Sequence, residues 1–310
     1  MSNRNKKLAI FKRFADNFKI VAANPYYNWE APLPEIAYLC PICFNFFNKC
    51  SSNQEGQNYL TFEHLPPKKL GGKPDILTCR NCNGLHSLND RELSREVKLL
   101  SFLRNDVGSK LRDIDIQAGD KRFRTTIEKE ADSKLKFTLK NQTELLQLVE
   151  LINNEKDFKF GGDKADPRSV QLAILKSAYL LAFKKFGYGY ILHSSFNPIR
   201  EQLLNPNTEV LPSLGVLFGN NSKGIFVVTN PIHARSLYIN FELKISSGSF
   251  FAGALIPTPS TNVIDFYQQI KPMTEGKSQI TLINIHNQKY LSDKHSVFYH
   301  FDLKQYFKDS

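Results

Sequence analysis

The sequence predicts an α+β protein in which a cysteine-containing module precedes a mixed α+β C-terminal domain. Three observations lead to this prediction. Two Cys-x-x-Cys pairs lie within residues 40–82, an apolar segment between Asp166 and Gly187 has the length of a buried helix, and later runs such as KGIFVVTN and SLYINFELKI have strand character. The chain has 310 residues, more than one ordinary core usually organises, so we expect more than one domain.

Four regions follow one another along the chain. The start is basic and loosely amphipathic, which predicts a helix, and the alternation of polar and apolar residues in DKRFRTTIEKEADSKLKFTLK predicts strands. The segment NQTELLQLVELINN predicts a further helix. The expected regions are a basic N-terminal helix and connector (1–35), the cysteine-containing module (36–104), a strand-rich connecting region (105–165) and an α+β C-terminal domain of unassigned role (166–310).

The C-terminal domain is expected to begin with a long buried helix. Asp166 is a suitable N-cap because its carboxylate can accept a hydrogen bond from the first helical turn, and Pro167 has the backbone torsion that a first helical position needs. The segment stays apolar over several turns and stops at Gly187. The sequence after it is dominated by strand-like runs.

The charge balance favours a polyanionic partner. Lys and Arg together number 41 against 30 Asp and Glu, so the formal net charge is +11 and the pI is near 9.3. Such a surplus raises the association rate with nucleic acid, the commonest polyanion. No apolar run has the form of a secretory signal or approaches the ~20 residues that span a bilayer. We therefore expect a cytoplasmic protein with no membrane partner.

Four of the five cysteines form two knuckles that are spaced for metal ligation. Cys40 and Cys43 form the first pair, and Cys79 and Cys82 form the second. Four thiolates around Zn²⁺ give a closed tetrahedral site, which stabilises structure and leaves no open position for chemistry. In a chain without a signal peptide this pattern predicts a structural zinc ion and not disulfides. Cys50 is left over and is expected to be an ordinary thiol.

A second group of residues lies between and just after the cysteine pairs. It reads Glu63-His64-Leu65-Pro66-Pro67, then Gly71-Gly72, then Cys79-Arg80-Asn81-Cys82-Asn83. In order and residue type it resembles the HNH (ββα-metal) endonucleases carried on a zinc-bound treble clef, and it is most similar to a bacterial subgroup with Glu-His-x-x-Pro, Gly-Gly and Cys-x-x-Cys-Asn. The resemblance covers about residues 37–95. It implies a treble-clef ββα-metal module and metal-dependent hydrolysis of phosphodiester bonds, with DNA as the expected substrate and bacterial defence or a mobile element as the expected setting.

The resemblance also implies roles for single residues. His64 matches the general base, and an imidazole titrates near neutral pH, so it can take a proton from water. Glu63 and Asn83 match two ligands of a catalytic ion, and carboxylate and amide oxygens suit Mg²⁺ or another divalent cation. The middle Asn of the family would fall at Pro74, which cannot orient the base. Asp75 or a backbone carbonyl is the expected substitute, and the loss puts full catalytic strength in doubt.

Further residues near this group have weaker assignments. His86 lies three positions after Asn83 on one helical face and is either a third ligand of the catalytic ion or an exposed or merely packed histidine. Asp90 is about 10 Å further along the axis of a continuous helix, so it is expected to be structural or to support a ligand. The basic side chains that flank the motif are candidates for contacts with nucleic acid: Lys68, Lys69 and Arg80.

Other readings of the sequence stay open. The module could be a zinc-stabilised nucleic-acid-binding unit without hydrolytic activity, or a scaffold for a protein partner. The C-terminal domain has no recognisable catalytic pattern, and it could read DNA, form a homodimer or bind a partner protein. The basic strand around Phe123, with Lys121, Arg122 and Arg124, is either a track for a nucleic-acid backbone or a solvated strand face.

Overall fold

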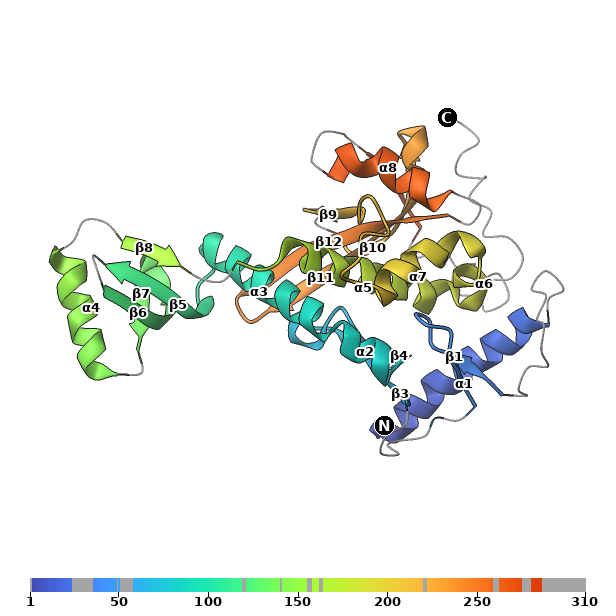
Figure 1. Cartoon of the computed structure of the whole chain (residues 1–310), viewed down its shortest axis with the longest axis horizontal. Coiled ribbons are helices and arrows are strands. Elements are labelled where there is room, and N and C mark those ends of the chain that lie inside the picture. Colours follow the sequence, from blue (N-terminus) through green and yellow to red (C-terminus); the bar gives the residue numbers. More distant parts are fainter. Residues whose placement is uncertain are drawn as a thin grey trace.

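The computed structural model describes residues 2–23, 36–48, 50, 58–118, 121–139, 141–154, 158–161, 164–219, 222–258, 262–274 and 280–285. It is a mixed α and β protein, as predicted (Figure 1). Among the helices of these residues, none is both long enough and apolar enough to cross a lipid bilayer.

The N-terminal helix α1 (Asn3–Ala22) belongs to the main core. Ser2 is its N-cap, and the Ser2 hydroxyl accepts a hydrogen bond from the backbone N–H of Asn5. One face of α1 carries buried aromatic residues, among which Phe14 stacks on Phe183 with ring centroids 4.4 Å apart. The helix that the basic sequence predicted is therefore held by aromatic packing and not by its charges.

Two short hairpins and two helices form the cysteine-containing module. The hairpin strands and helices are β1 (Tyr38–Leu39) with β2 (Phe46–Phe47), β3 (Leu60–Leu65) with β4 (Lys73–Cys79), α2 (Arg80–Leu85) and α3 (Ser87–Leu103). The helical segment predicted after the second knuckle is present, but it breaks at His86 into two helices. Side chains before and after this break therefore do not follow the spacing of one continuous helix.

The turn between β3 and β4 requires both of its glycines. Gly71 has a φ of 82° and ends the 3-10 turn Lys68–Leu70. A Cβ on Gly72 would lie 1.4 Å from the carbonyl oxygen of Pro66, so no side chain fits there. The Gly-Gly pair is thus explained by local backbone geometry.

The strand-rich middle region forms a unit with its own small core. Ile116, Phe123, Ile127 and Leu148 are the buried residues of this core. Figure 1 shows the unit beyond the C-terminal end of α3, to one side of the rest of the chain. Its four-stranded sheet has the order β7-β6-β5-β8 and carries one helix: β5 (Lys110–Ala118), β6 (Lys121–Lys129), β7 (Leu135–Thr138), α4 (Gln142–Asn154) and β8 (Phe158–Gly161).

Helix α5 (Pro167–Phe186) is the centre of the structure. Its predicted ends are confirmed: Asp166 accepts a hydrogen bond from the Ser169 N–H at 2.8 Å, and the helix stops at Gly187, which has a φ of 72°. The helix is buried on nearly all sides, in keeping with its apolar sequence.

A five-stranded sheet covers one side of α5, and the β3–β4 hairpin and α3 lie on another (Figure 1). The sheet has the order β13-β10-β11-β12-β9, and short helices flank it. One continuous hydrophobic core joins α1, the cysteine-containing module, α5 and this sheet. The remaining elements are α6 (Tyr188–Ile191), α7 (Asn197–Leu204), β9 (Val216–Phe218), β10 (Gly224–Asn230), β11 (Ser236–Ile245), β12 (Gly248–Pro257), α8 (Val263–Thr274) and β13 (Thr281–Asn284).

Candidate functional site

The four predicted cysteine ligands converge in a cluster that fits zinc. The sulfurs of Cys40, Cys43, Cys79 and Cys82 all lie within 4.8 Å of one another, and the Cys43 and Cys79 sulfurs are 3.7 Å apart. A tetrahedral ion with Zn–S bonds of about 2.3 Å would place its sulfurs about 3.8 Å apart. The distances therefore match a possible structural zinc site. Cys50 is a half-buried free thiol outside this group.

Local backbone structure orients the thiols toward the cluster. Cys79 ends β4 and is the N-cap of α2, so its sulfur accepts a hydrogen bond from the Cys82 N–H at 3.4 Å. The Cys79 N–H in turn donates to the Cys40 sulfur at 3.4 Å. Burial raises the pKa of the Cys40 thiol well above its usual range. A bound cation would reverse this effect, because a coordinating thiol is deprotonated.

Two tyrosines hold the first knuckle against the rest of the protein. Tyr179 on α5 donates a hydrogen bond to the carbonyl of Pro41, inside the Cys40–Cys43 turn, at 2.8 Å. Tyr188 donates to the Leu39 carbonyl at 2.6 Å and accepts from the Leu39 N–H at 2.9 Å. The sequence had no signal for these contacts, because they join segments more than a hundred residues apart. The cysteine-containing module is thus built onto the C-terminal half.

A cation also lies beside the knuckle. The Arg200 guanidinium on α7 is 3.5 Å from the centroid of the Phe44 ring, directly after Cys43. Its buried Nε has no hydrogen-bond partner among the described residues. A zinc ion with four thiolates would carry net negative charge, and Arg200 would stabilise such a cluster electrostatically.

Glu63 is buried and lies in a network of charges. One of its carboxylate oxygens is 3.1 Å from the Lys176 ammonium on α5, and the other accepts a hydrogen bond from the Thr78 hydroxyl at 3.0 Å. Lys176 also contacts the Asp90 carboxylate at 2.9 Å. The side chains of Lys176 and Glu63 are only 1% and 3% exposed. Asp90 lies beyond the helix break and joins this network through Lys176, a residue to which the sequence analysis gave no role.

The charges in this network depend on one another. Burial alone would lower the pKa of Lys176, but Glu63 and Asp90 outweigh that effect and raise it, so the ammonium stays charged. Burial raises the pKa of Asp90, which the Lys176 charge partly offsets. One ammonium therefore compensates two carboxylates that come from β3 and α3.

His64 follows Glu63 on β3 at an irregular point of the hairpin. Glu63 is paired with Ile76 and His64 with Pro74, so Asp75 is an extra residue in β4. The Asp75 carboxylate accepts a hydrogen bond from Lys184 at 2.7 Å. Burial, together with the charges of Lys68 and Lys6, lowers the pKa of the half-buried His64 imidazole below its usual range, and Asp75 and Glu63 partly oppose this.

Asn83 connects α2 to the same strand. Its amide nitrogen donates to the Thr61 hydroxyl at 2.9 Å and to the Phe62 carbonyl at 3.1 Å. These bonds engage the amide nitrogen of Asn83 and not its amide oxygen. Glu63, His64 and Asn83 are thus positioned on, or bonded to, β3.

The other predicted site residues lie around this group. His86 is fully buried, its Nδ1 lies 3.1 Å from the Asn89 amide, and burial lowers its pKa to about 3. Lys68 and Lys69 are exposed on the 3-10 turn. Arg80 is exposed at the start of α2, with its guanidinium 5.5 Å from the centroid of the Tyr59 ring.

In the described residues, one cluster has enough ligand side chains close together to hold a metal ion. The four cysteines are the one group of three or more cysteine, histidine or carboxylate side chains in that part of the chain whose ligand atoms lie close enough for an ion. Comparisons of the chain with models of protein families, with curated proteins and with solved structures found no match. The assignment of function therefore depends on the residues and their geometry.

Proposed function

We propose that the protein is a zinc-stabilised, metal-dependent endonuclease that hydrolyses phosphodiester bonds in nucleic acid, with DNA as its substrate. The observation that carries this proposal is the grouping of three side chains along β3. Glu63 and His64 are consecutive residues of the strand, and the two hydrogen bonds from Asn83 attach α2 to it. The cysteine cluster lies where β4 enters α2, so a zinc ion there would fix the hairpin and the helix relative to each other.

The chain's own residues account for the proton transfer and for the attraction of substrate. The lowered pKa of His64 keeps its imidazole neutral near pH 7, which is the form that accepts a proton from water. The nearby ammonium groups of Lys6 and Lys68 favour a phosphate beside it. Exposed Lys69 and Arg80 extend the positive charge along the module.

The donor set at β3 suits a hard divalent cation. Glu63 and the Asn83 amide oxygen would hold it, and a bound Mg²⁺ would take up charge on the phosphate oxygens. In the structure the Glu63 carboxylate is already paired with Lys176 and Thr78. A cation can therefore bind Glu63 only by displacing the Lys176 ammonium. This predicts a low affinity for the cation, so that activity needs a high concentration of it.

The same ion pair favours a second candidate function, a zinc-stabilised nucleic-acid-binding module without hydrolytic activity. If Lys176 permanently neutralises Glu63, the module keeps its fold and its positive surface but has no acidic ligand for a catalytic ion. Pro74 also favours the binding module, because it stands where members of the resembled family carry an Asn and it cannot orient the base.

A plasmid-nicking assay separates the two functions. Protein loaded with Zn²⁺ is incubated with supercoiled plasmid, with Mg²⁺ or Mn²⁺ added or omitted, so that zinc is never removed. His64→Gln keeps the side chain polar and removes the base, and the matched control is His233→Gln at an exposed histidine outside the site. We expect nicking that depends on the added ion and falls by about 10²–10⁴-fold in His64→Gln alone.

One result of this assay would reject the assigned base, and another would reject the endonuclease. Equal nicking by wild type and His64→Gln would exclude the assigned base. Binding of plasmid without cleavage at any concentration of divalent ion would leave the binding module.

A further inference from the structure

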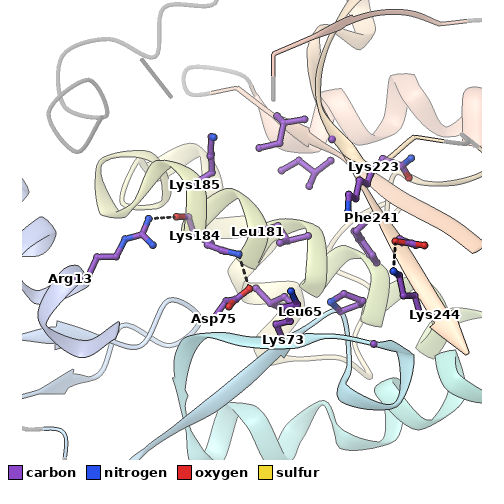
Figure 2. Close-up of a pocket in the computed structure, with 17 residues that line it drawn as sticks. Arg13, Leu65, Lys73, Asp75, Leu181, Lys184, Lys185, Lys223, Phe241 and Lys244 are labelled. Atoms are coloured by element: carbon purple, nitrogen blue, oxygen red, sulfur yellow. Dashed lines mark hydrogen bonds and ion pairs between the residues drawn. The ribbon is translucent and has the colours of Figure 1, made fainter. Parts of the chain in front are cut away.

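A large cavity lies between the cysteine-containing module and the C-terminal sheet. Its volume is about 570 Å³, within the range of small-molecule sites. Figure 2 shows its parts: Leu65, Lys73 and Asp75 from the β3–β4 hairpin, Lys184 and Lys185 from α5, and Phe241 and Lys244 from β11. The cavity is therefore assembled from segments that are distant in the sequence.

The lining of the cavity is strongly basic. Two carboxylates face it, and both are paired: Asp75 with Lys184 at 2.7 Å and Glu242 with Lys244 at 3.3 Å. The cations outnumber these carboxylates by four: Arg13, Lys73, Lys184, Lys185, Lys223 and Lys244. Burial and the neighbouring charges of Lys184 and Arg13 lower the pKa of Lys185, so the cations repel one another. An anion with several charges would relieve this repulsion.

The rest of the wall is apolar and partly aromatic. It would accept a flat ring, and the buried Phe241 contributes to this apolar part of the wall. Lysine is suited to phosphate, to which it presents a compact point charge. The apolar lining side chains are Leu65, Pro66, Leu181, Ile225, Ile239 and Phe241.

The two halves of the cavity are held in close contact. Gly71, with a φ of 82°, lies under the side chain of Lys244, and a Cβ on Gly71 would be 2.9 Å from the Lys244 Cβ. The hairpin turn can therefore pack on β11 only because Gly71 has no side chain. Asp75 also belongs to the β4 irregularity opposite His64, so the cavity and the candidate catalytic strand share one wall.

We propose that this cavity binds a nucleotide through its phosphates, with the phosphate groups among the lysines and the base against Phe241 and the aliphatic wall. A terminal phosphate carries about two negative charges near neutral pH, so a chain of two or three phosphates matches the excess positive charge. The nucleotide is either a free nucleoside polyphosphate or the 5′ end of a nucleic-acid strand. This inference holds whether or not the protein cleaves DNA.

Calorimetric titration of the whole zinc-loaded chain tests the proposal. The probes are ATP, adenosine, tripolyphosphate and a 5′-phosphorylated tetranucleotide, without added divalent ion. The variant Lys73→Glu/Lys223→Glu reverses two exposed cations of the cavity, and Lys121→Glu reverses an exposed lysine of the middle unit as the matched control. Thermal unfolding establishes that all three proteins are folded.

We expect ATP to bind more tightly than adenosine or tripolyphosphate, because only ATP uses both the apolar wall and the lysines. The double variant should weaken ATP binding by about 100-fold, about tenfold for each reversed charge in the cavity, and the control should leave it unchanged. If the tetranucleotide binds in the same charge-dependent way and ATP does not, the strand end is the source of the nucleotide. The proposal would be overturned if neither ATP nor the tetranucleotide binds. It would also be overturned if the double variant does not weaken their binding. None of these results depends on plasmid nicking.

Discussion

Replacing Lys176 by methionine should destabilise the whole fold, although this residue lies in the middle of an apolar helix. Methionine has a similar length and no charge, so the substitution leaves Glu63 and Asp90 in place without their ammonium. The two contacts are 3.1 and 2.9 Å long. At an effective dielectric constant of about 20, each is worth about 5 kcal/mol of attraction before the cost of desolvation is subtracted.

The free energy of unfolding that Lys176→Met loses is smaller than this attraction, because burying the Lys176 ammonium costs free energy that the variant no longer spends. Removal of one partner from a buried pair typically destabilises a protein by about 3–5 kcal/mol. We take that range for Lys176→Met, since Glu63 is 3% exposed and cannot recover its hydration, while Asp90 is 23% exposed and recovers part of it.

Lys184→Met is the matched control because it makes the same change on the same helix. Lys184 pairs with Asp75 alone, and the two side chains are 36% and 24% exposed. A pair that water reaches contributes about 0–1 kcal/mol. The double variant Glu63→Gln/Lys176→Met should be less destabilised than the sum of its single variants, because it leaves one buried charge fewer without a partner.

Urea unfolding of the zinc-loaded proteins, followed by circular dichroism, measures these differences. If Lys176→Met unfolds within about 1 kcal/mol of wild type, like Lys184→Met, the reasoning about the buried network is refuted. A double variant as unstable as the sum of its parts would show that Glu63 and Lys176 do not interact.

Three further predictions concern the zinc cluster, the hairpin turn and a buried histidine. Cys79→Ser should lose zinc and unfold the module, because structural zinc contributes folding free energy; a folded variant with full zinc content by metal analysis would contradict the cluster. Gly72→Ala should destabilise the protein by more than about 1 kcal/mol, because its Cβ would overlap the Pro66 carbonyl, whereas Gly84→Ala, in an open helical position, should be neutral or stabilising by thermal unfolding. His86 has a folded-state pKa of about 3, so its contribution to stability is complete above the usual pKa of about 6.5 and falls by about 1.4 kcal/mol for each pH unit below it. The pH dependence of unfolding between pH 7 and 5 should therefore be shallower in His86→Gln than in wild type. Equal slopes would show that His86 takes up its proton at the same pH in the folded and unfolded states.

Local patterns in the sequence predicted the elements that local physics controls. The ends of α5 followed from Asp166 and Gly187, and the clustering of the four cysteines followed from their spacing. The expected continuous helix after the second knuckle was wrong at His86, where the chain breaks so that the imidazole packs inside the core. The spacing argument for Asp90 failed for the same reason, since it assumed one straight axis.

Lys176 left a signal that sequence reasoning passed over. It is a lone cation in the segment AILKSAYLL, within a helix that is apolar on nearly every side. A charge that must be buried needs a carboxylate, and such a helix therefore predicts a partner elsewhere in the chain. The sequence could not predict which carboxylate pairs with Lys176, because Glu63 is 113 residues away.

By itself the sequence determined the mixed α and β content, the cysteine framework and the long helix, because spacing, capping and turn chemistry act between residues that are near in the chain. Only the tertiary structure decided that Lys176 neutralises Glu63 and Asp90, that tyrosines of α5 and α6 hold the first knuckle, and that cations from α1, β4, α5 and the C-terminal sheet surround one cavity. Those contacts depend on which distant segments share a core. Hydrophobic packing brings these segments together, and because it is non-directional it cannot be predicted from residues that are neighbours in the chain.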